Sequence, residues 1–114
     1  MSNSNAIYTD VTSQNFSDRV LHASQMVIVN FSADWSGACQ VLDPEFEAVS
    51  KEYQGRVIFV RLKVDQNEEL TSQWGIDGIP TLLFFKNGQL INRIKGIMMR
   101  DKLRRQIEGA LLAL

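Results

Sequence analysis

The sequence predicts an α/β fold in which a mixed central β-sheet is flanked by helices on both faces, in the order β-α-β-α-β-α-β-β-α. The apolar run Met26–Phe31 is typical of a central strand buried on both faces, and Val57–Val64 is the next predicted strand, with Val57, Phe59 and Val64 among its buried candidates. A helical pattern separates them, which indicates parallel strands joined by a right-handed crossover. The pair Asn87-Gly88 lies between two further strand patterns and predicts a hairpin, so the sheet also contains an antiparallel pair.

The chain opens with a strand signal and a first helix signal. We expect a strand around Ile7 and Tyr8, and then a helix that Thr12 caps at its N-terminus. The apolar residues of this helix are Phe16, Val20 and Leu21.

A longer helix is expected between residues 36 and 53, where apolar residues recur at helical spacing. Pro44 lies inside this helix and should kink it, because proline lacks the amide donor of the preceding turn. Gly55 then signals the end of the helix. The apolar face of the helix consists of Leu42, Phe46, Val49 and Tyr53.

The second half of the chain contains a short helix, the hairpin and a last helix. Asn67 is expected to cap the short helix, which passes through Leu70 and the core residue Trp74 and ends at Gly75. The hairpin strands are Thr81–Phe85 and Gln89–Ile94. The last helix has one apolar face, made of Leu103, Ile107, Leu111 and Leu114.

Length and composition indicate one domain. The chain has 114 residues, of which 45% are hydrophobic and 22% are charged. We assign residues 7–114 to a single domain and residues 1–6 to a flexible N-terminal tail. The tail lacks the apolar segment of a secretory signal, and no apolar run approaches the ~18 residues of a membrane span. We therefore expect a cytoplasmic protein without a membrane partner.

Charge and cysteine content restrict the chemistry further. The net charge is −1, so no global field attracts the chain to nucleic acid. The segment between Arg93 and Arg105 is locally basic, and we interpret it as the solvated face of the last helix. The single cysteine, Cys39, excludes an intramolecular disulfide and favours a reducing compartment. One cysteine and one histidine, His22, do not make a four-ligand zinc site, so we expect no metal and no cofactor.

The segment Phe31-Ser32-Ala33-Asp34-Trp35-Ser36-Gly37-Ala38-Cys39 resembles the active-site segment of the thioredoxin family, whose core is Trp-Cys-Gly-Pro-Cys. Further similarities follow in the same order: Pro44 at a helix kink, Val64–Asn67, Gly75–Leu82, Phe85–Gly88 and Gly96. The resemblance covers residues 7–114 and implies a thioredoxin fold, with Ile79-Pro80 in the position of the family's cis-proline.

The departures from the family pattern bear on function. Ser36 stands where the family has its attacking cysteine, and Ala38 replaces the proline between the two cysteines. Asn30 replaces a buried aspartate, and Ser32 replaces an aromatic residue. Cys39 remains, at the resolving position. Thiol–disulfide exchange needs one thiol to attack and a second to release the mixed disulfide. The resemblance therefore implies a relative that has lost dithiol chemistry.

Ser36 and Cys39 have separate interpretations. A serine nucleophile needs an adjacent base, and His22 lies on the first helix, so we interpret Ser36 as a helix N-cap. Cys39 is the only redox-capable residue, and two roles remain open for it: a small buried hydrophobe, or a reactive single thiol.

The resemblance also implies a groove for an extended peptide. Its residues are Trp35, Gly37, Ala38, Ile79, Pro80, Thr81 and Gly96, with Ile97, Met98 and Met99 at the border. The backbone of Ile79 would pair with a partner strand, and Trp35 would be an aromatic anchor. Two alternatives stay open, namely that Pro80 only stabilises a turn and that Trp35 belongs to the edge of the core.

Three functional hypotheses follow. The leading one is a binding or adaptor protein that engages protein or peptide partners in extended form. The first alternative is a monothiol redox protein in which Cys39 forms a mixed disulfide with glutathione or with a protein and contributes to cell redox homeostasis. The second alternative is a chaperone-like holdase.

Overall fold

The structure, a computed structural model, describes residues 9–113 and contains a five-stranded sheet in the order β1-β3-β2-β4-β5. Strand β2 pairs in parallel with β3 and antiparallel with β4, while β1 extends the parallel side and β5 the antiparallel side. The mixed sheet that the sequence predicts is therefore confirmed. The strands are β1 Thr9–Val11, β2 Met26–Ser32, β3 Val57–Lys63, β4 Thr81–Lys86 and β5 Gln89–Lys95.

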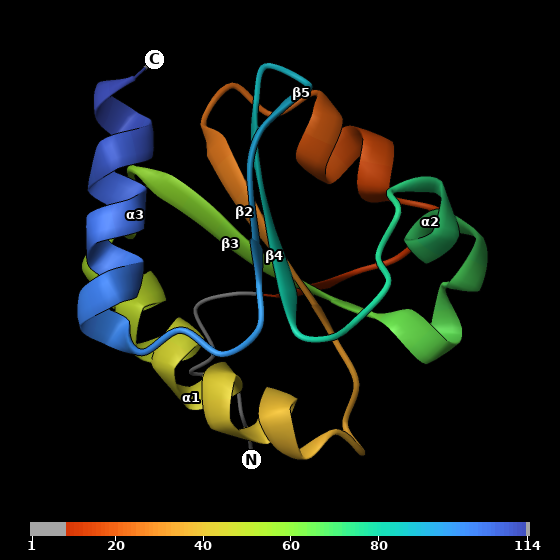
Figure 1. The fold of residues 1–114 in the computed structure, drawn as a ribbon. Coiled ribbons are helices and arrows are strands. Elements are labelled where there is room, and N and C mark those ends of the chain that lie inside the picture. The colour runs from red at the N-terminus through yellow and green to blue at the C-terminus, as the bar shows by residue number, and fades with distance from the viewer. Residues whose placement is uncertain (1–8, 114) are drawn as a thin grey trace, which may run out of the picture.

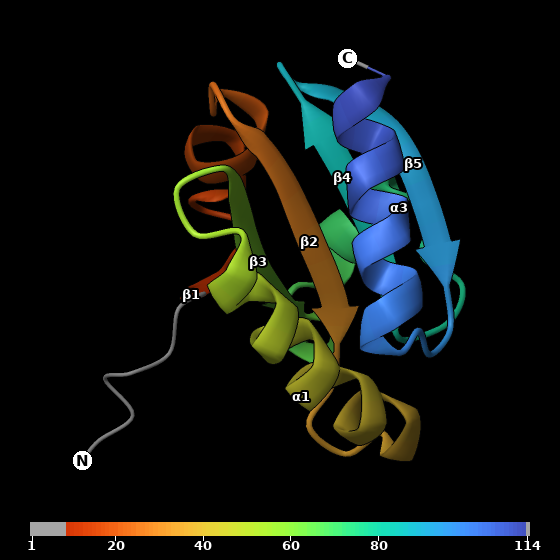
Figure 2. The ribbon, with the colours of Figure 1, turned by 90° about the vertical axis from the view of Figure 1, so that its left-hand side faces the viewer.

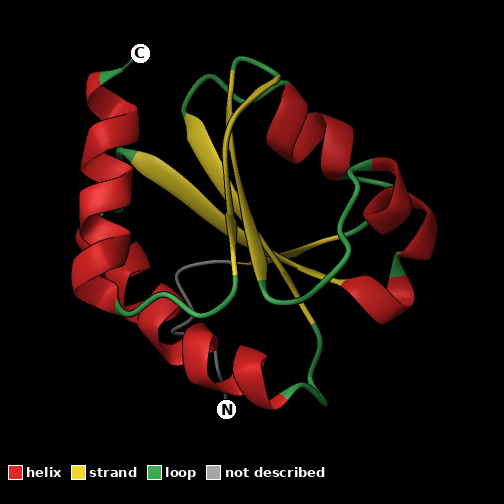
Figure 3. Ribbon diagram, viewed as in Figure 1, coloured by secondary structure: helices red, strands yellow, loops and turns green. Residues whose placement is uncertain are grey.

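Helices cover both faces of the sheet (Figures 1 and 3). One face carries α1 and α3, which lie side by side in front of the strands in Figure 2. The other face carries η1 and α2. None of the helices in residues 9–113 is long and apolar enough to cross a membrane. The helical segments are η1 Ser17–Leu21, α1 Gly37–Glu52, η2 Val64–Gln66, α2 Glu68–Gln73 and α3 Arg100–Leu112.

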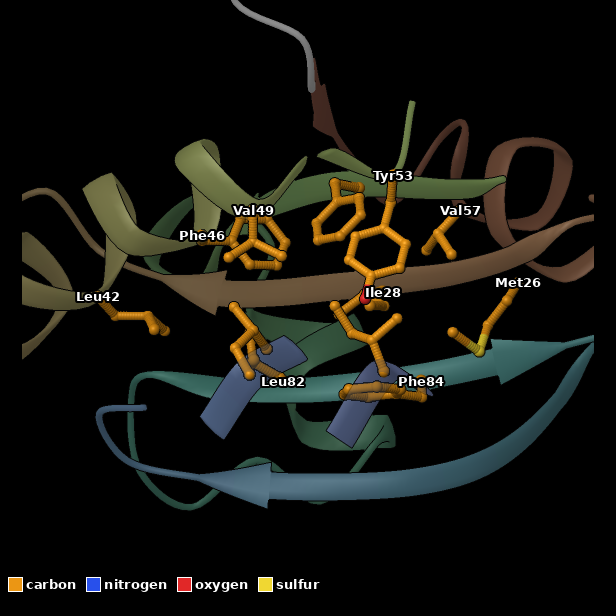
Figure 4. Close-up of a cluster of buried hydrophobic side chains, with 12 residues drawn as sticks. Met26, Ile28, Leu42, Phe46, Val49, Tyr53, Val57, Leu82 and Phe84 are labelled. Atoms are coloured by element: carbon orange, nitrogen blue, oxygen red, sulfur yellow. The ribbon is translucent and has the colours of Figure 1, made fainter. Parts of the chain in front are cut away.

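Strand β2 runs through the middle of the core, and all seven of its residues are buried. Its side chains alternate between the two faces. Met26 and Ile28 point toward α1 and α3, where they join the cluster drawn in Figure 4. Val27, Val29 and Phe31 join the second cluster, on the other face, against which the predicted core residue Trp74 also packs. The two faces therefore have separate hydrophobic cores, with β2 shared between them.

The N-terminal expectations are partly wrong. The strand expected around Ile7 and Tyr8 and the tail of residues 1–6 lie outside the described residues, and the described strand begins at Thr9. Thr12 caps no helix: its hydroxyl accepts a hydrogen bond from the Gln14 amide in a turn, and the helical segment starts only at Ser17. Alternative side-chain-to-backbone bonds of this kind compete with capping, which local sequence does not resolve.

Asn67 occupies the N-cap position of α2, but its side chain makes no capping bond. Its amide instead accepts hydrogen bonds from the Ser13 amide and hydroxyl, and donates one to the Lys63 carbonyl at 2.9 Å. The predicted cap is therefore wrong in function, because a distant loop offers donors that compete for the same oxygen. Val64, predicted in a strand, forms the start of the 3₁₀ turn η2.

Helix α3 begins without a side-chain cap from its own sequence, because Met99 occupies the N-cap position. Glu45 of α1 replaces the cap: its carboxylate accepts a hydrogen bond from the Arg100 amide at 3.0 Å and also binds the Arg100 side chain. These hydrogen bonds lower the pKa of Glu45 below its usual value, chiefly through the Arg100 side chain. The beginning of α3 is thus fixed to α1. Along the predicted apolar face of α3, Leu103 and Ile107 are buried and Leu111 is half-buried, whereas Leu114 lies outside the described residues.

The β4–β5 hairpin turns at Asn87 and Gly88, whose φ angles of 52° and 78° are both positive. Glycine is also required at this turn by space. A Cβ added to Gly88 would lie 2.9 Å from the Leu21 carbonyl oxygen, so the turn is packed directly against η1.

We expect Gly88→Ala to lower the free energy of unfolding by about 1–3 kcal/mol, because both the positive φ and the contact with Leu21 disfavour a Cβ. Gly109→Ala is the matched control. Gly109 lies within α3 with nothing within 4 Å of an added Cβ, and should gain about 0.5–1 kcal/mol. Urea denaturation measures the free energy of unfolding of both variants. Equal values would contradict the inference that the turn is packed against η1.

Candidate functional site

The candidate site lies where β2 ends and α1 begins. Ser36 is the N-cap residue of α1, with extended backbone angles, and its hydroxyl accepts a hydrogen bond from the Cys39 amide at 3.2 Å. This is the geometry of a helix N-cap. His22 lies at the end of η1, where its ring nitrogen Nδ1 is 3.0 Å from the Ser17 carbonyl oxygen. The site therefore holds Ser36 as a structural cap, without a histidine base beside it.

Cys39, one turn into α1, is completely buried, with 0% of its surface exposed. No disulfide involves it, as the single cysteine requires. A buried thiol away from solvent behaves as a small hydrophobe and is protected from reagents. Of the two roles that remained open, burial favours the structural one.

Asn30 and Ser32, the polar residues at the end of β2, meet a carboxylate that comes from α1. The Asn30 side-chain amide donates to Asp43 Oδ1 at 2.9 Å, and the Ser32 hydroxyl lies 3.3 Å from Asp43 Oδ2. Arg61 of β3 bridges Asp43 at 3.5 Å and Asp10 of β1 at 3.0 Å. The resemblance to the thioredoxin family places a buried aspartate at the position of Asn30 on β2. In this chain the carboxylate beside that position belongs to Asp43, which comes from α1.

This polar cluster leaves one atom unsatisfied. Asn30 is fully buried, and its side-chain oxygen has no hydrogen-bond partner among the described residues. Buried polar atoms are nearly always paired, so the orphan oxygen costs stability that the Asp43 hydrogen bond partly offsets.

The predicted groove residues meet beside this helix terminus. The Ile79-Pro80 peptide bond is cis, and the Gly96 amide donates to the Pro80 carbonyl at 2.8 Å, which fixes the end of β5 against the proline loop. Pro80 itself is buried, whereas 68% of Trp35 is exposed. Trp35 therefore does not belong to the edge of the core.

The proline loop leaves backbone groups available for hydrogen bonds, and the glycines near it have free space around them. Neither the amide nor the carbonyl of Ile79 has a hydrogen-bond partner within residues 9–113. A Cβ added at Gly37 or Gly96 would meet nothing within 4 Å. The Thr81 hydroxyl donates to the Gly78 carbonyl at 2.7 Å and so helps to hold the loop.

One ion pair and one hydrogen bond attach the loop that carries Ile79 to β5. Lys95 of β5 binds Asp77 at 3.1 Å, and this hydrogen-bonded lysine lowers the pKa of the Asp77 carboxyl group. The Arg93 guanidinium donates to the Trp74 carbonyl at 2.8 Å. Both contacts tie the loop to β5, so the backbone of Ile79 is presented on a fixed frame.

Exposed apolar side chains border the site. They are Trp35 itself and, in the segment after Gly96 between β5 and α3, Ile97 and Met99; Val41, one turn after Gly37 on α1, is also exposed. Ala38, on the first turn of α1, is partly covered. Within residues 9–113, no group of three or more His, Cys, Asp or Glu residues is arranged to hold a metal ion.

Sequence reasoning missed Asp43, Arg61 and Val41. For Asp43 a signal existed: a buried strand that ends in polar residues such as Asn30 and Ser32 requires polar partners from the helix that covers it. Asp43 lies four residues after Cys39, on the same face of α1. Val41 carried no such signal, because a single apolar residue on a helix is common on protein surfaces.

Comparison with known proteins supports the fold. The family model described as Thioredoxin matches residues 7–109. A thioredoxin of Chlorobaculum thiosulfatiphilum is 33% identical over 101 residues, which cover 89% of this chain and 94% of that protein. Thioredoxin 1 of Nostoc sp. is 34% identical over 98 residues, or 86% of this chain and 92% of the relative. A thioredoxin of Synechocystis sp. is 36% identical with the same coverage.

We expect Asp43→Ala to lower the free energy of unfolding by about 1–3 kcal/mol, because the buried Asn30 amide and the Ser32 hydroxyl lose their acceptor. Asp34→Ala is the control: Asp34 pairs with Lys63 but its side chain is 69% exposed, so the loss should stay below about 0.5 kcal/mol. Denaturant titration compares them, and equal losses would mean that the Asp43 cluster does not stabilise the helix–sheet contact.

Burial of Cys39 predicts slow alkylation. In the native protein, iodoacetamide should react with Cys39 at least about 100-fold more slowly than in guanidinium chloride, because reaction requires local opening of α1. Mass spectrometry follows the adduct with time. Similar rates in both solvents would show that the thiol is accessible and would favour the monothiol alternative.

Proposed function

This chain belongs to the thioredoxin family, and we propose that it is a non-dithiol binding or adaptor protein that holds extended segments of other proteins beside the cis-proline loop. The observation that supports the proposal is an exposed aromatic side chain and open backbone groups next to a helix terminus without an attacking thiol. Trp35 is exposed and the backbone groups of Ile79 have no hydrogen-bond partner within residues 9–113, whereas Ser36 is a helix cap.

The residues at the helix terminus argue against turnover. A dithiol reductase requires a second thiol that resolves the mixed disulfide, and this chain has one cysteine. The hydroxyl of Ser36 already accepts the Cys39 amide, and it is not a redox group. Burial of Cys39 also argues against the monothiol alternative, because glutathione or a partner thiol must reach the sulfur.

The proposed binding mode is strand addition. A partner segment in extended form pairs with the free amide and carbonyl of Ile79, while Gly37 and Gly96 leave room for its backbone to approach closely. One of its side chains packs against the ring of Trp35, which offers a large apolar contact with few rotatable bonds. Backbone pairing gives affinity for many sequences, and the aromatic contact adds selectivity.

A holdase function is the second candidate, favoured by the exposed apolar residues Val41, Ile97 and Met99 next to the groove. Methionine adapts its shape to varied partners. Exposed apolar patches of this kind mark interaction surfaces. The two candidates differ in the kind of protein that they bind. An adaptor binds folded partners through one segment, whereas a holdase binds aggregating chains and suppresses their precipitation.

We expect the reduced and alkylated insulin B chain, an extended peptide without free thiols, to bind the wild-type protein. Trp35→Ala should raise its Kd at least about tenfold, because the exposed aromatic contact is lost. Trp35→Phe keeps a ring and serves as the matched control, with a smaller loss. Fluorescence anisotropy of the labelled peptide measures all three.

The same protein should fail to reduce insulin with dithiothreitol or with thioredoxin reductase, and Cys39→Ser should bind the peptide as the wild type does. Reduction at the rate of a dithiol thioredoxin, or unchanged binding by Trp35→Ala, would contradict the proposal. A mixed disulfide that the wild type forms on incubation with oxidised glutathione, with release of one reduced glutathione, and that Cys39→Ser does not form, would instead support the monothiol alternative.

A further inference from the structure

A cavity of about 340 Å³ lies between β5 and α3, at the end of the molecule opposite the candidate site. Figure 1 shows the arrangement: α3 starts beside α1 at the bottom and ends at the top, where β5 begins. The cavity therefore lies far from the loop between β5 and α3 that borders the groove. The residues that line it are Ile91, Asn92, Arg105, Gln106, Gly109, Ala110 and Ala113.

A β-bulge in β5 and small residues on α3 leave this space open. Ile91 is the extra residue of a β-bulge, because Phe84 pairs with Asn92 and Phe85 with Leu90. Bulges redirect side chains, and Ile91 is exposed and lines the cavity. On the α3 side, Gly109 and Ala113 are too small to fill the space, and a Cβ added at Gly109 meets nothing within 4 Å. The apolar part of the lining, made of Ile91, Ala110 and Ala113, is thus reachable from solvent, beside Asn92, whose side-chain amide donates to Gln106 at 3.3 Å.

The rim of the cavity is positively charged. Within residues 9–113, the side chains of Arg105 and Lys102 form no ion pair or hydrogen bond. The acidic residues of the same helix are already engaged: Asp101 binds Arg104, and Glu108 accepts from the Tyr53 hydroxyl. An unpaired guanidinium beside an apolar cavity attracts a carboxylate that is attached to an apolar group.

We propose that this cavity docks a segment of a partner protein in which a large apolar side chain is adjacent to an acidic residue. The apolar side chain fills the space above Gly109 and contacts Ile91, and the carboxylate pairs with Arg105. Leu112, 86% exposed on the same helix, extends the apolar surface beyond the cavity and so favours a protein segment over a small molecule.

A second copy of this chain is a poorer occupant. Symmetric pairing through this face would bring Arg105 and Lys102 of one copy against the same cations of the other, and like charges across an interface are unfavourable. The proposed docking surface is separate from the groove beside Trp35, and it holds or fails independently of the proposed function.

The test selects a phage-displayed library of random dodecapeptides against the Trp35→Ala protein, so that binding at the groove is weakened. Enriched peptides should combine a leucine, isoleucine, methionine or phenylalanine with an adjacent aspartate or glutamate. Gly109→Leu fills the cavity, and Arg105→Glu reverses the charge at its rim. Each should raise the Kd of the enriched peptides at least about tenfold.

Arg19→Glu is the matched control for charge reversal, because Arg19 is exposed on η1, on the other face of the sheet. It should leave the Kd unchanged, and thermal unfolding verifies that every variant is folded. Enrichment of basic peptides, or a Kd that neither Gly109→Leu nor Arg105→Glu changes, would overturn the proposal. A dimer in sedimentation that disappears in Gly109→Leu would also overturn it, by assigning the cavity to a second copy.

Discussion

The burial of β2 on both faces is the constraint from which the other features of this structure follow. Strand β2 lies in the centre of the sheet and exposes none of its seven residues. Each of its polar side chains therefore requires a hydrogen-bond partner inside the protein. Asn30 and Ser32 have this requirement, and Asp43 of α1 meets it for the Asn30 amide nitrogen and the Ser32 hydroxyl, whereas the Asn30 side-chain oxygen has no partner among the described residues. The position of α1 over the sheet is thus set by apolar packing along most of its length and by a polar cluster near its N-terminus.

The same helix terminus determines what chemistry the site supports. Ser36 caps the helix and Cys39 is buried in its first turn, so this helix terminus has no accessible thiol. The carboxylate of this region is carried by the helix and is shared with Arg61. These groups stabilise the contact between the helix and the sheet, and Lys95 and Arg93 attach the neighbouring loop to β5.

Helix α3 connects the two ends of the molecule. Its first residue is capped by Glu45, Arg104 binds Glu52 at 2.7 Å, and the Tyr53 hydroxyl donates to Glu108 at 2.6 Å. Burial, together with that hydrogen bond, raises the pKa of Tyr53 to about 12, so the phenol stays protonated at neutral pH. These contacts attach α3 firmly to α1. The candidate site at one end and the cavity at the other are therefore connected through a helix that is attached to α1 along its length.

The order of strands and helices, the β4–β5 turn at Asn87 and Gly88 and the cap at Ser36 were predictable from the amino-acid sequence, because each depends on residues close together in the chain. The partners of the polar side chains follow from the folded arrangement instead. Asn67 binds a distant loop, Thr12 forms a turn, and Asp43 reaches across to Asn30. The folded arrangement also decided that Cys39 is buried and Trp35 exposed. Periodicity shows which face of an element is apolar, whereas hydrogen-bond partners and exposure depend on segments that only folding brings together.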